Sequence, residues 1–92
     1  MDEARMKIQH QYDNQGGAFF IERNGVRIAE LTYRTFDRLL DANHTRVDPQ
    51  LRGQRLADQL YQAFIEFVDQ GGYNVRPSCS YIEAKMRKEK RI

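Results

Sequence analysis

The segment from Val47 to Ala57 joins a strand-like pattern to a helix-like one through a turn that contains glycine. A strand that feeds a helix in this way aims the unpaired N–H groups of the first helical turn at one point, where the helix dipole adds positive potential. Arg52 and Arg55 can add full positive charges at the same point. The segment therefore predicts a site for a phosphate or pyrophosphate group.

Two side chains outside this segment, His44 and Cys79, could take part in group transfer. The ordinary pKa of histidine suits a general base that deprotonates an amine; the alternative for His44 is a half-buried strand residue that holds a neighbouring carbonyl. A thiol near a helix N-terminus can act as a nucleophile, whereas most free cysteines are small buried hydrophobes. His10 has no comparable support and is expected at the surface. Two histidines and one cysteine do not form a metal-ligand set, so no metal site is predicted.

The elements that must position these residues begin with four strands. They are predicted at Lys7–Tyr12, Ala18–Arg23, Val26–Tyr33 and about Arg38–Val47. Asn24-Gly25 is a strong signal for a two-residue hairpin, since both positions tolerate positive φ. Simple alternation along the fourth strand puts Leu40, Ala42 and His44 on one face and Leu39, Asp41, Asn43, Thr45 and Val47 on the other.

From Arg52 onward the period becomes helical. The apolar stripe of this helix consists of Leu56, Leu60, Ala63, Phe64, Phe67 and Val68. Gly71-Gly72 ends the helix, Tyr73–Arg76 is a short fifth strand, and a last helix runs from Tyr81 to about Lys90 after possible N-cap residues. The order β-β-β-β-α-β-α indicates an α+β protein whose fourth and fifth strands are parallel neighbours.

Composition bounds the class of protein. The chain has 92 residues, 40% hydrophobic and 30% charged, with a formal net charge of +2, which fits one globular domain over residues 1–92. This charge is too small to argue for a nucleic-acid partner. No signal peptide or membrane span is apparent, and the single cysteine excludes an internal disulfide, so a cytoplasmic location is expected. The Lys/Arg-rich end, from Lys85 to Arg91, is expected to be a solvated helix end that frays.

Three local sequences occur in order at workable spacing. They are His44 to Val47 followed by Pro49, then Leu51 to Gln54 with Leu56-Ala57, and finally Pro77 to Tyr81. With the order of elements, they resemble the small single-domain GNAT-like N-acetyltransferases over roughly Phe19 to Tyr81. The resemblance implies a minimal GNAT fold, with a mixed and mostly antiparallel sheet in which the parallel fourth and fifth strands splay apart.

The resemblance implies acetyl-CoA as cofactor. The pantetheine arm is expected against the fourth strand at Thr45, Arg46 and Val47. The pyrophosphate is expected on the turn formed by Arg52, Gly53, Gln54, Arg55, Leu56 and Ala57. Gly53 suits this role because it has no Cβ to block a close approach of the backbone to phosphate. Arg55 departs from the family, whose turns usually carry Gly or Ala at this position.

The same resemblance implies catalytic roles. Tyr81 matches a tyrosine early in the last helix that often protonates the CoA thiolate in GNAT enzymes; the alternative is an aromatic that packs under the sheet with its hydroxyl bonded. Together with Cys79 and His44 it is expected to surround the acetyl group. The acceptor is an unidentified amine, on a small molecule or a protein, that attacks directly or through acetylated Cys79. The protein is expected to be a monomer or weak dimer.

Two other functions compete with this hypothesis. A non-catalytic acyl-CoA-binding module, regulatory or part of a larger assembly, would bind CoA without releasing it from a thioester. A small basic nucleic-acid-binding domain would instead use strand aromatics and the C-terminal basic cluster, and its binding would depend on salt and survive mutation of Gly53.

Overall fold

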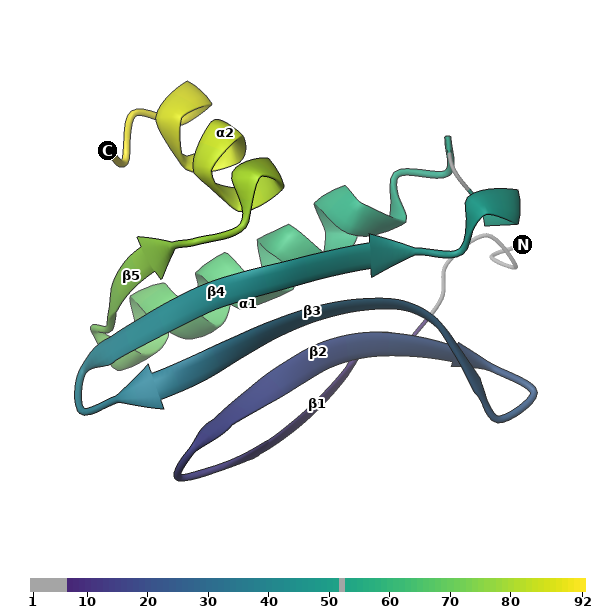
Figure 1. Cartoon of the computed structure of the whole chain (residues 1–92), viewed down its shortest axis with the longest axis horizontal. Coiled ribbons are helices and arrows are strands. Elements are labelled where there is room, and N and C mark those ends of the chain that lie inside the picture. The colour runs from purple at the N-terminus through teal and green to yellow at the C-terminus, as the bar shows by residue number, and fades with distance from the viewer. Residues whose placement is uncertain (1–6, 52) are drawn as a thin grey trace.

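The computed structural model describes residues 7–51 and 53–92 and contains a five-stranded sheet, two α-helices and one short 3₁₀ helix (Figure 1). The elements are β1 (Gln9–Asp13), β2 (Gly16–Arg23), β3 (Val26–Phe36), β4 (Leu39–Val47), η1 (Pro49–Leu51), α1 (Leu56–Gly71), β5 (Asn74–Pro77) and α2 (Ser80–Lys88). The predicted order of strands and helices is confirmed. Among the described residues, no helix combines the length and apolar character needed to cross a membrane.

The strands lie in the sheet in chain order, from β1 to β5. The first four are antiparallel neighbours, and β5 pairs with β4 in parallel, so the predicted α+β class and mixed sheet are confirmed. The β4–β5 ladder runs only from Leu39 opposite Asn74 to Ala42 opposite Pro77, although β4 continues to Val47. The two strands therefore splay apart beyond Ala42, as expected.

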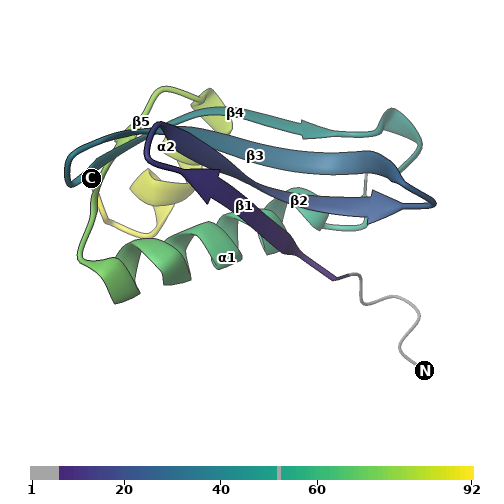
Figure 2. The ribbon, with the colours of Figure 1, turned by 90° about the horizontal axis from the view of Figure 1, so that it is seen from below.

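Both helices cover one face of the sheet, and no helix of residues 7–51 and 53–92 covers the other face (Figure 2). The apolar stripe of α1 is buried against the sheet, and Leu60, Tyr61 and Phe64 are fully inaccessible to solvent. Ile82 and Met86 of α2 belong to the same core cluster. The two faces of the sheet thus differ sharply: one is sealed by helices and the other is open.

A β-bulge lies in the middle of β4. Thr32 of β3 is opposite His44, but the next residue, Tyr33, is opposite Ala42, so Asn43 is an extra residue on β4. The extra residue reverses the alternation of side chains that follow it. Thr45 and Val47 therefore share the helix-covered face with Ala42, and His44 lies on the open face. The prediction that His44 shares a face with Leu40 and Ala42 is wrong, because simple alternation does not allow for a bulge.

The beginning of α1 also differs from the prediction. The helix begins at Leu56 rather than near Arg52, because η1 intervenes and Arg55 then adopts a left-handed backbone conformation with φ of 59°. The end of the helix is as predicted: Gly72, with φ of 68°, caps it, and its N–H donates to the last helical carbonyls.

The region before β2 is more buried than expected. The ring of His10 stacks on Phe19 with centroids 3.9 Å apart, and its Nε2 lies 2.7 Å from the hydroxyl oxygen of Tyr33. Burial lowers the pKa of His10 from its ordinary value. The expectation that His10 is a surface residue is therefore wrong, since pairing of β1 with β2 brings it against the aromatic core.

The C-terminal basic segment is tied to the rest of the molecule. The guanidinium of Arg91 donates to both carboxylate oxygens of Asp69 on α1, at 3.1 Å each. The backbone N–H of Arg91 donates to the carbonyl of Met86. Residues 87–92 are exposed, as expected for a solvated helix end, and Arg91 has an acidic partner on α1.

Candidate functional site

The gap between β4 and β5 is held open by the connection to α2. Directly after the last β4–β5 pair, the backbone N–H of Cys79 donates to the carbonyl of Ala42 at 2.9 Å. Cys79 is also the N-cap residue of α2, which turns the chain away from β4. In the described part of the chain, β5 offers no ladder partner to the stretch of β4 that contains Thr45, Arg46 and Val47. This stretch can therefore bind an extended, amide-containing ligand through its backbone.

The N-terminus of α1 faces the same region. Its N-cap residue, Arg55, makes no side-chain capping bond, so the first-turn N–H groups of Leu56, Ala57 and Asp58 are available to a ligand. Gly53 has φ of +91°, and a methyl group added there would meet no atom within 4 Å. The N–H of Gln54 is already used by the Leu51 carbonyl, at 3.4 Å. Arg52, also predicted to contact phosphate, lies outside the described residues.

A hollow of about 450 Å³ connects the end of β4, the turn and the start of α2. It is lined by Val47, Leu51, Gly53, Arg55, Leu56, Ala57, Asp58 and Tyr81. The structure thus brings together most of the residues predicted to bind the cofactor. The side chain of Arg46 does not face this hollow. It lies on the open face of the sheet, with Nε 3.6 Å from Oε2 of Glu30.

The hydroxyl of Tyr81 is held on one wall of this hollow. It donates to the carboxylate of Asp58, whose Oδ1 also lies 3.2 Å from Nζ of Lys85. Burial and the bond to this carboxylate both raise the pKa of Tyr81 above its ordinary value. The same bond is the largest cause of the lowered pKa of Asp58. Asp58 was not predicted as a site residue, because an acid in the first turn of a helix is common for dipole reasons alone.

The place where β4 and β5 diverge, beyond the pair Ala42–Pro77, is called the fork below. Cys79 lies at the fork on the helix-covered side of the sheet. Its side chain is partly buried, and Sγ donates to the hydroxyl oxygen of Thr45 at 3.4 Å. Its carbonyl accepts the N–H of Glu83 in the first turn of α2. The thiol is therefore close to the stretch of β4 that is predicted to bind the cofactor, as the resemblance implies.

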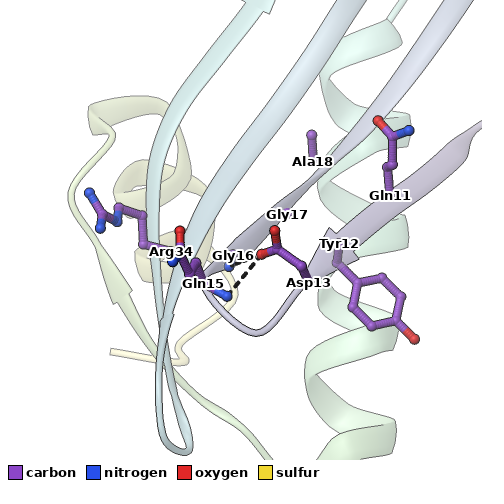
Figure 3. A pocket seen from close by; sticks show the side chains of 8 residues that line it. All are labelled: Gln11, Tyr12, Asp13, Gln15, Gly16, Gly17, Ala18 and Arg34. Atoms are coloured by element: carbon purple, nitrogen blue, oxygen red, sulfur yellow. Dashed lines mark hydrogen bonds between the residues drawn. The ribbon is translucent and has the colours of Figure 1, made fainter.

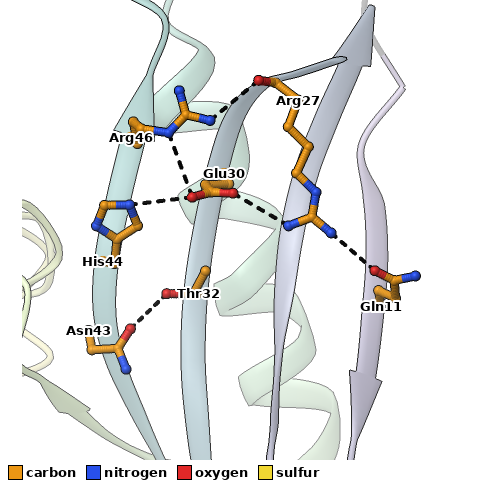
Figure 4. Close-up of polar contacts among 7 residues, drawn as sticks. All are labelled: Gln11, Arg27, Glu30, Thr32, Asn43, His44 and Arg46. Carbon is orange, nitrogen blue, oxygen red and sulfur yellow. Dashed lines mark hydrogen bonds and ion pairs between the residues drawn. The ribbon is translucent and has the colours of Figure 1, made fainter. Parts of the chain in front are cut away.

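His44 occupies the opposite face of the sheet, as Figure 4 shows. Its Nε2 lies 3.4 Å from Oε2 of Glu30, and about half of its side chain is exposed. The three predicted catalytic residues therefore form two groups: Cys79 and Tyr81 on the helix side, and His44 on the open side. Glu30 was missed by sequence reasoning; the signal that could have found it is its predicted place on a strand beside the one that carries His44.

A second hollow, of about 530 Å³, contains none of the predicted residues (Figure 3). It lies at the β1–β2 hairpin and is lined by Gln11, Tyr12, Asp13, Gln15, Gly16, Gly17, Ala18 and Arg34. The carboxylate of Asp13 accepts the backbone N–H groups of Gln15 and Gly16, at 2.9 and 3.2 Å. These bonds stabilise the turn itself, so this hollow does not offer a comparable site.

Solved structures share this fold. A solution structure of a GCN5-like N-acetyltransferase from Staphylococcus aureus superposes with a TM-score of 0.69 at 28% identity, covering 99% of this chain and 85% of that one. A ribosomal-protein-alanine N-acetyltransferase from Brucella melitensis biovar Abortus 2308 superposes with a TM-score of 0.62 at 13% identity, covering 83% of this chain and 62% of that one. A GNAT family protein from Staphylococcus aureus subsp. aureus superposes with a TM-score of 0.61 at 18% identity, covering 71% of this chain and 57% of that one. The chain thus spans under two thirds of the length of the last two.

The sequence itself matches a family model. The search of curated proteins found no match. The model described as GCN5-related N-acetyl-transferase, however, matches residues 18–92, which include β2 to α2 and both sides of the fork. The chain therefore belongs to the GCN5-related N-acetyltransferases, the GNAT family of enzymes.

Proposed function

We propose that this protein transfers an acetyl group from acetyl-CoA to an amine. The observation that carries the proposal is the fork between β4 and β5 beside the uncapped N-terminus of α1. Backbone edges and first-turn N–H groups that converge on one hollow suit a ligand with both an amide-containing arm and a diphosphate.

The residues of the hollow fit such a ligand in shape and charge. The amides of Leu56 and Ala57 would hold the diphosphate, and Gly53 leaves space beside it. The left-handed conformation of Arg55 is one that glycine adopts at no steric cost, which gives a reason for glycine at this position. The one carboxylate in the hollow, Asp58, is balanced by Lys85 and Tyr81, so it does not leave an unpaired negative charge facing phosphate.

We assign the acceptor amine to the open face of the sheet. Both helices fill the other face, whereas His44 is accessible at the fork on the open side. Acetyl-CoA, when bound, supplies a thioester: the amine nitrogen bonds to its carbonyl carbon as the carbon–sulfur bond breaks. His44 takes the proton that the amine loses, which is the role of a general base.

Direct attack by the amine is favoured over transfer through Cys79. The hydroxyl of Thr45, which contacts the thiol, is not a base, and His44 lies on the other face of the sheet. Cys79 is therefore better suited to protonate the departing thiolate than to attack the thioester. Tyr81 can take that role only after its hydroxyl leaves Asp58. Intact-mass measurement after incubation with acetyl-CoA tests this. An acetylated species that forms with the wild type but not with Cys79→Ala would support the covalent route instead.

Calorimetry with acetyl-CoA tests the proposal as a whole. Wild type should bind, and Gly53→Glu should lose most of its affinity, because it puts a negative charge where the diphosphate is expected. Gly25→Glu is a matched control: Gly25 also has positive φ, 79°, and open space around its Cα, but it lies in the β2–β3 hairpin. Absence of binding by wild type would overturn the proposal.

A panel of amines then separates the enzyme from a binding module. Release of free CoA that depends on an amine supports transfer, whereas saturable binding without release by any amine supports the non-catalytic acyl-CoA-binding module. Small-molecule and protein amines both belong in the panel, since the open face does not enclose the acceptor. A cytoplasmic location and a monomeric or weakly dimeric state remain part of the proposal.

A further inference from the structure

Glu30 lies at the centre of a charged cluster on the open face of the sheet (Figure 4). Its side chain is only 19% exposed, although it points away from the helices. Oε1 lies 3.4 Å from Nη1 of Arg27, and Oε2 lies 3.6 Å from Nε of Arg46 and 3.4 Å from Nε2 of His44. One carboxylate thus has three basic partners on two strands.

The position of Glu30 is fixed from several sides. The guanidinium of Arg27 lies over the ring of Phe20, 3.9 Å from its centroid, and also donates to Gln11. Arg46 donates to the backbone carbonyl of Arg27 at 3.3 Å. Each arginine therefore has a second partner besides Glu30, and the two together hold the carboxylate next to His44.

The backbone of His44 is fixed by the bulge. The hydroxyl of Thr32 donates to the side-chain oxygen of Asn43, the extra residue, at 2.7 Å. This bond ties the bulge to β3 and leaves rotation of the imidazole as the main remaining freedom of His44. The contact to Glu30 through Nε2 restricts that rotation.

We propose that Glu30 is a positioning residue for His44: its carboxylate accepts a hydrogen bond from the Nε2–H group, so that the lone pair of Nδ1 takes the proton from the acceptor amine. A neutral imidazole carries its single proton on one nitrogen, and the partner of that nitrogen decides which one. Since a carboxylate cannot donate, it selects the tautomer with hydrogen on Nε2. This inference rests on the proposed function, in which His44 is the base.

The competing explanation is a solvated ion-pair network with no influence on His44. Exposed pairs of this kind contribute little to the free energy of unfolding. Such a network would be indifferent to the tautomer of His44, whereas the positioning role requires that loss of the carboxylate change it. The two explanations therefore differ in a spectroscopic property and not only in activity.

The experiment compares wild type with Glu30→Gln, which keeps the size of the side chain but can also donate to the imidazole. Ring nitrogen chemical shifts of ¹⁵N-labelled protein at about pH 8, where an ordinary histidine is neutral, report the tautomer. The chain has two histidines, so His44→Ala assigns the signals. We expect the Nε2–H form in wild type and a mixed population in Glu30→Gln.

Kinetics on the same proteins complete the test. In Glu30→Gln we expect kcat to fall at least about tenfold, as part of the roughly 10²- to 10⁴-fold that a general base contributes, with the Kd for acetyl-CoA unchanged. Glu30→Asp should recover part of the rate because it restores a carboxylate. Glu66→Gln, the same change on the solvent side of α1, should have no effect on the rate or on the His44 spectrum.

The outcomes are distinguishable. An active wild type whose His44 carries its proton on Nδ1 overturns the inference, as does a Glu30→Gln variant with wild-type kcat or an unchanged His44 spectrum. A wild type that binds acetyl-CoA but acetylates no amine overturns the proposed function, even if its tautomer is as expected. If Glu30→Gln unfolds, Glu30→Asp carries the comparison, because the shorter carboxylate should still shift the tautomer population and kcat.

Discussion

The two faces of the sheet show two ways of holding polar side chains. On the helix-covered face, Tyr81 and Cys79 are partly buried, and each has one specific partner, Asp58 and Thr45. On the open face, His44 and Arg46 are exposed and share the single carboxylate of Glu30. The covered face can exclude water from a bound cofactor, whereas the open face can admit an acceptor of variable size. The proposed function uses this difference, and the following substitutions test it.

The largest effect on stability is expected from the core of the covered face. Phe64 is fully buried, and its ring packs edge-on against Phe19. Phe64→Ala should lower the free energy of unfolding by about 3–5 kcal/mol, since it removes apolar burial and leaves a cavity. Phe20→Ala on the open face should cost less, because Phe20 lies outside the main core cluster and the flexible side chain of Arg27 lies over its ring. Urea unfolding measures both; equal losses would contradict the contrast between the faces.

The largest effect on the reaction is expected from the open face. His44→Gln should reduce kcat by about 10²-fold or more, because it removes the proposed base. The Kd for acetyl-CoA should not change, since the hollow proposed to bind the cofactor lies on the other side of the sheet. Arg34→Gln, a nearby exposed change on the open face, is the control and should leave both values as in wild type. A parallel loss of cofactor affinity in His44→Gln would mean that the two faces are not functionally separate.

A smaller effect is expected from single hydrogen bonds. Tyr81→Phe removes the donor to Asp58 and should lower the free energy of unfolding by about 1 kcal/mol at neutral pH. Because the Tyr81 bond lowers the pKa of Asp58, this stabilisation should be present above the ordinary pKa of Asp and be lost as pH falls through the lowered one. Thr32→Val removes an exposed bond on the open face, and the change should stay within about 0.5 kcal/mol. Urea unfolding of both variants at neutral and acidic pH measures these changes. A larger loss of unfolding free energy in Thr32→Val than in Tyr81→Phe would contradict the prediction.

The smallest effect is expected from pH acting on His10. Burial lowers its pKa in the folded state, so the unfolded chain binds the proton more readily. Its contribution to stability is complete above the ordinary pKa of 6.5 and is lost as pH falls below that value toward the lowered pKa. Unfolding at about pH 7.5 and 5.5 should show a decline that is smaller in His10→Phe. The same decline in both proteins would assign it to other groups.

Much of the fold could be predicted because the signals are local. The Asn24-Gly25 turn joins β2 and β3 as expected, and Gly72 ends α1. The hollow at Gly53, Leu56 and Ala57 also follows from a strand–turn–helix pattern that can be read along the chain. In each case the backbone preference of a few adjacent residues is enough.

The arrangement of the site could not be predicted in the same way. The face on which His44 lies depends on the bulge at Asn43, and the bulge exists only in the pairing of β4 with β3. Glu30 acquires its partners from neighbouring strands, and Asp58 meets Tyr81 only when α2 packs on α1. These contacts join residues far apart in the sequence, so periodicity and spacing carry no signal for them.

The sequence by itself determined the order of the elements, the parallel pairing of β4 with β5 and the presence of a turn before α1, because turn chemistry and side-chain periodicity act over short stretches. The splaying of β4 from β5 was implied only by the resemblance to the GNAT family. Only the tertiary structure decided which side of the sheet each chemical group faces. One extra residue in β4 was sufficient to separate His44 from Cys79 and Tyr81, since side chains of a strand alternate and a single insertion reverses every position beyond it.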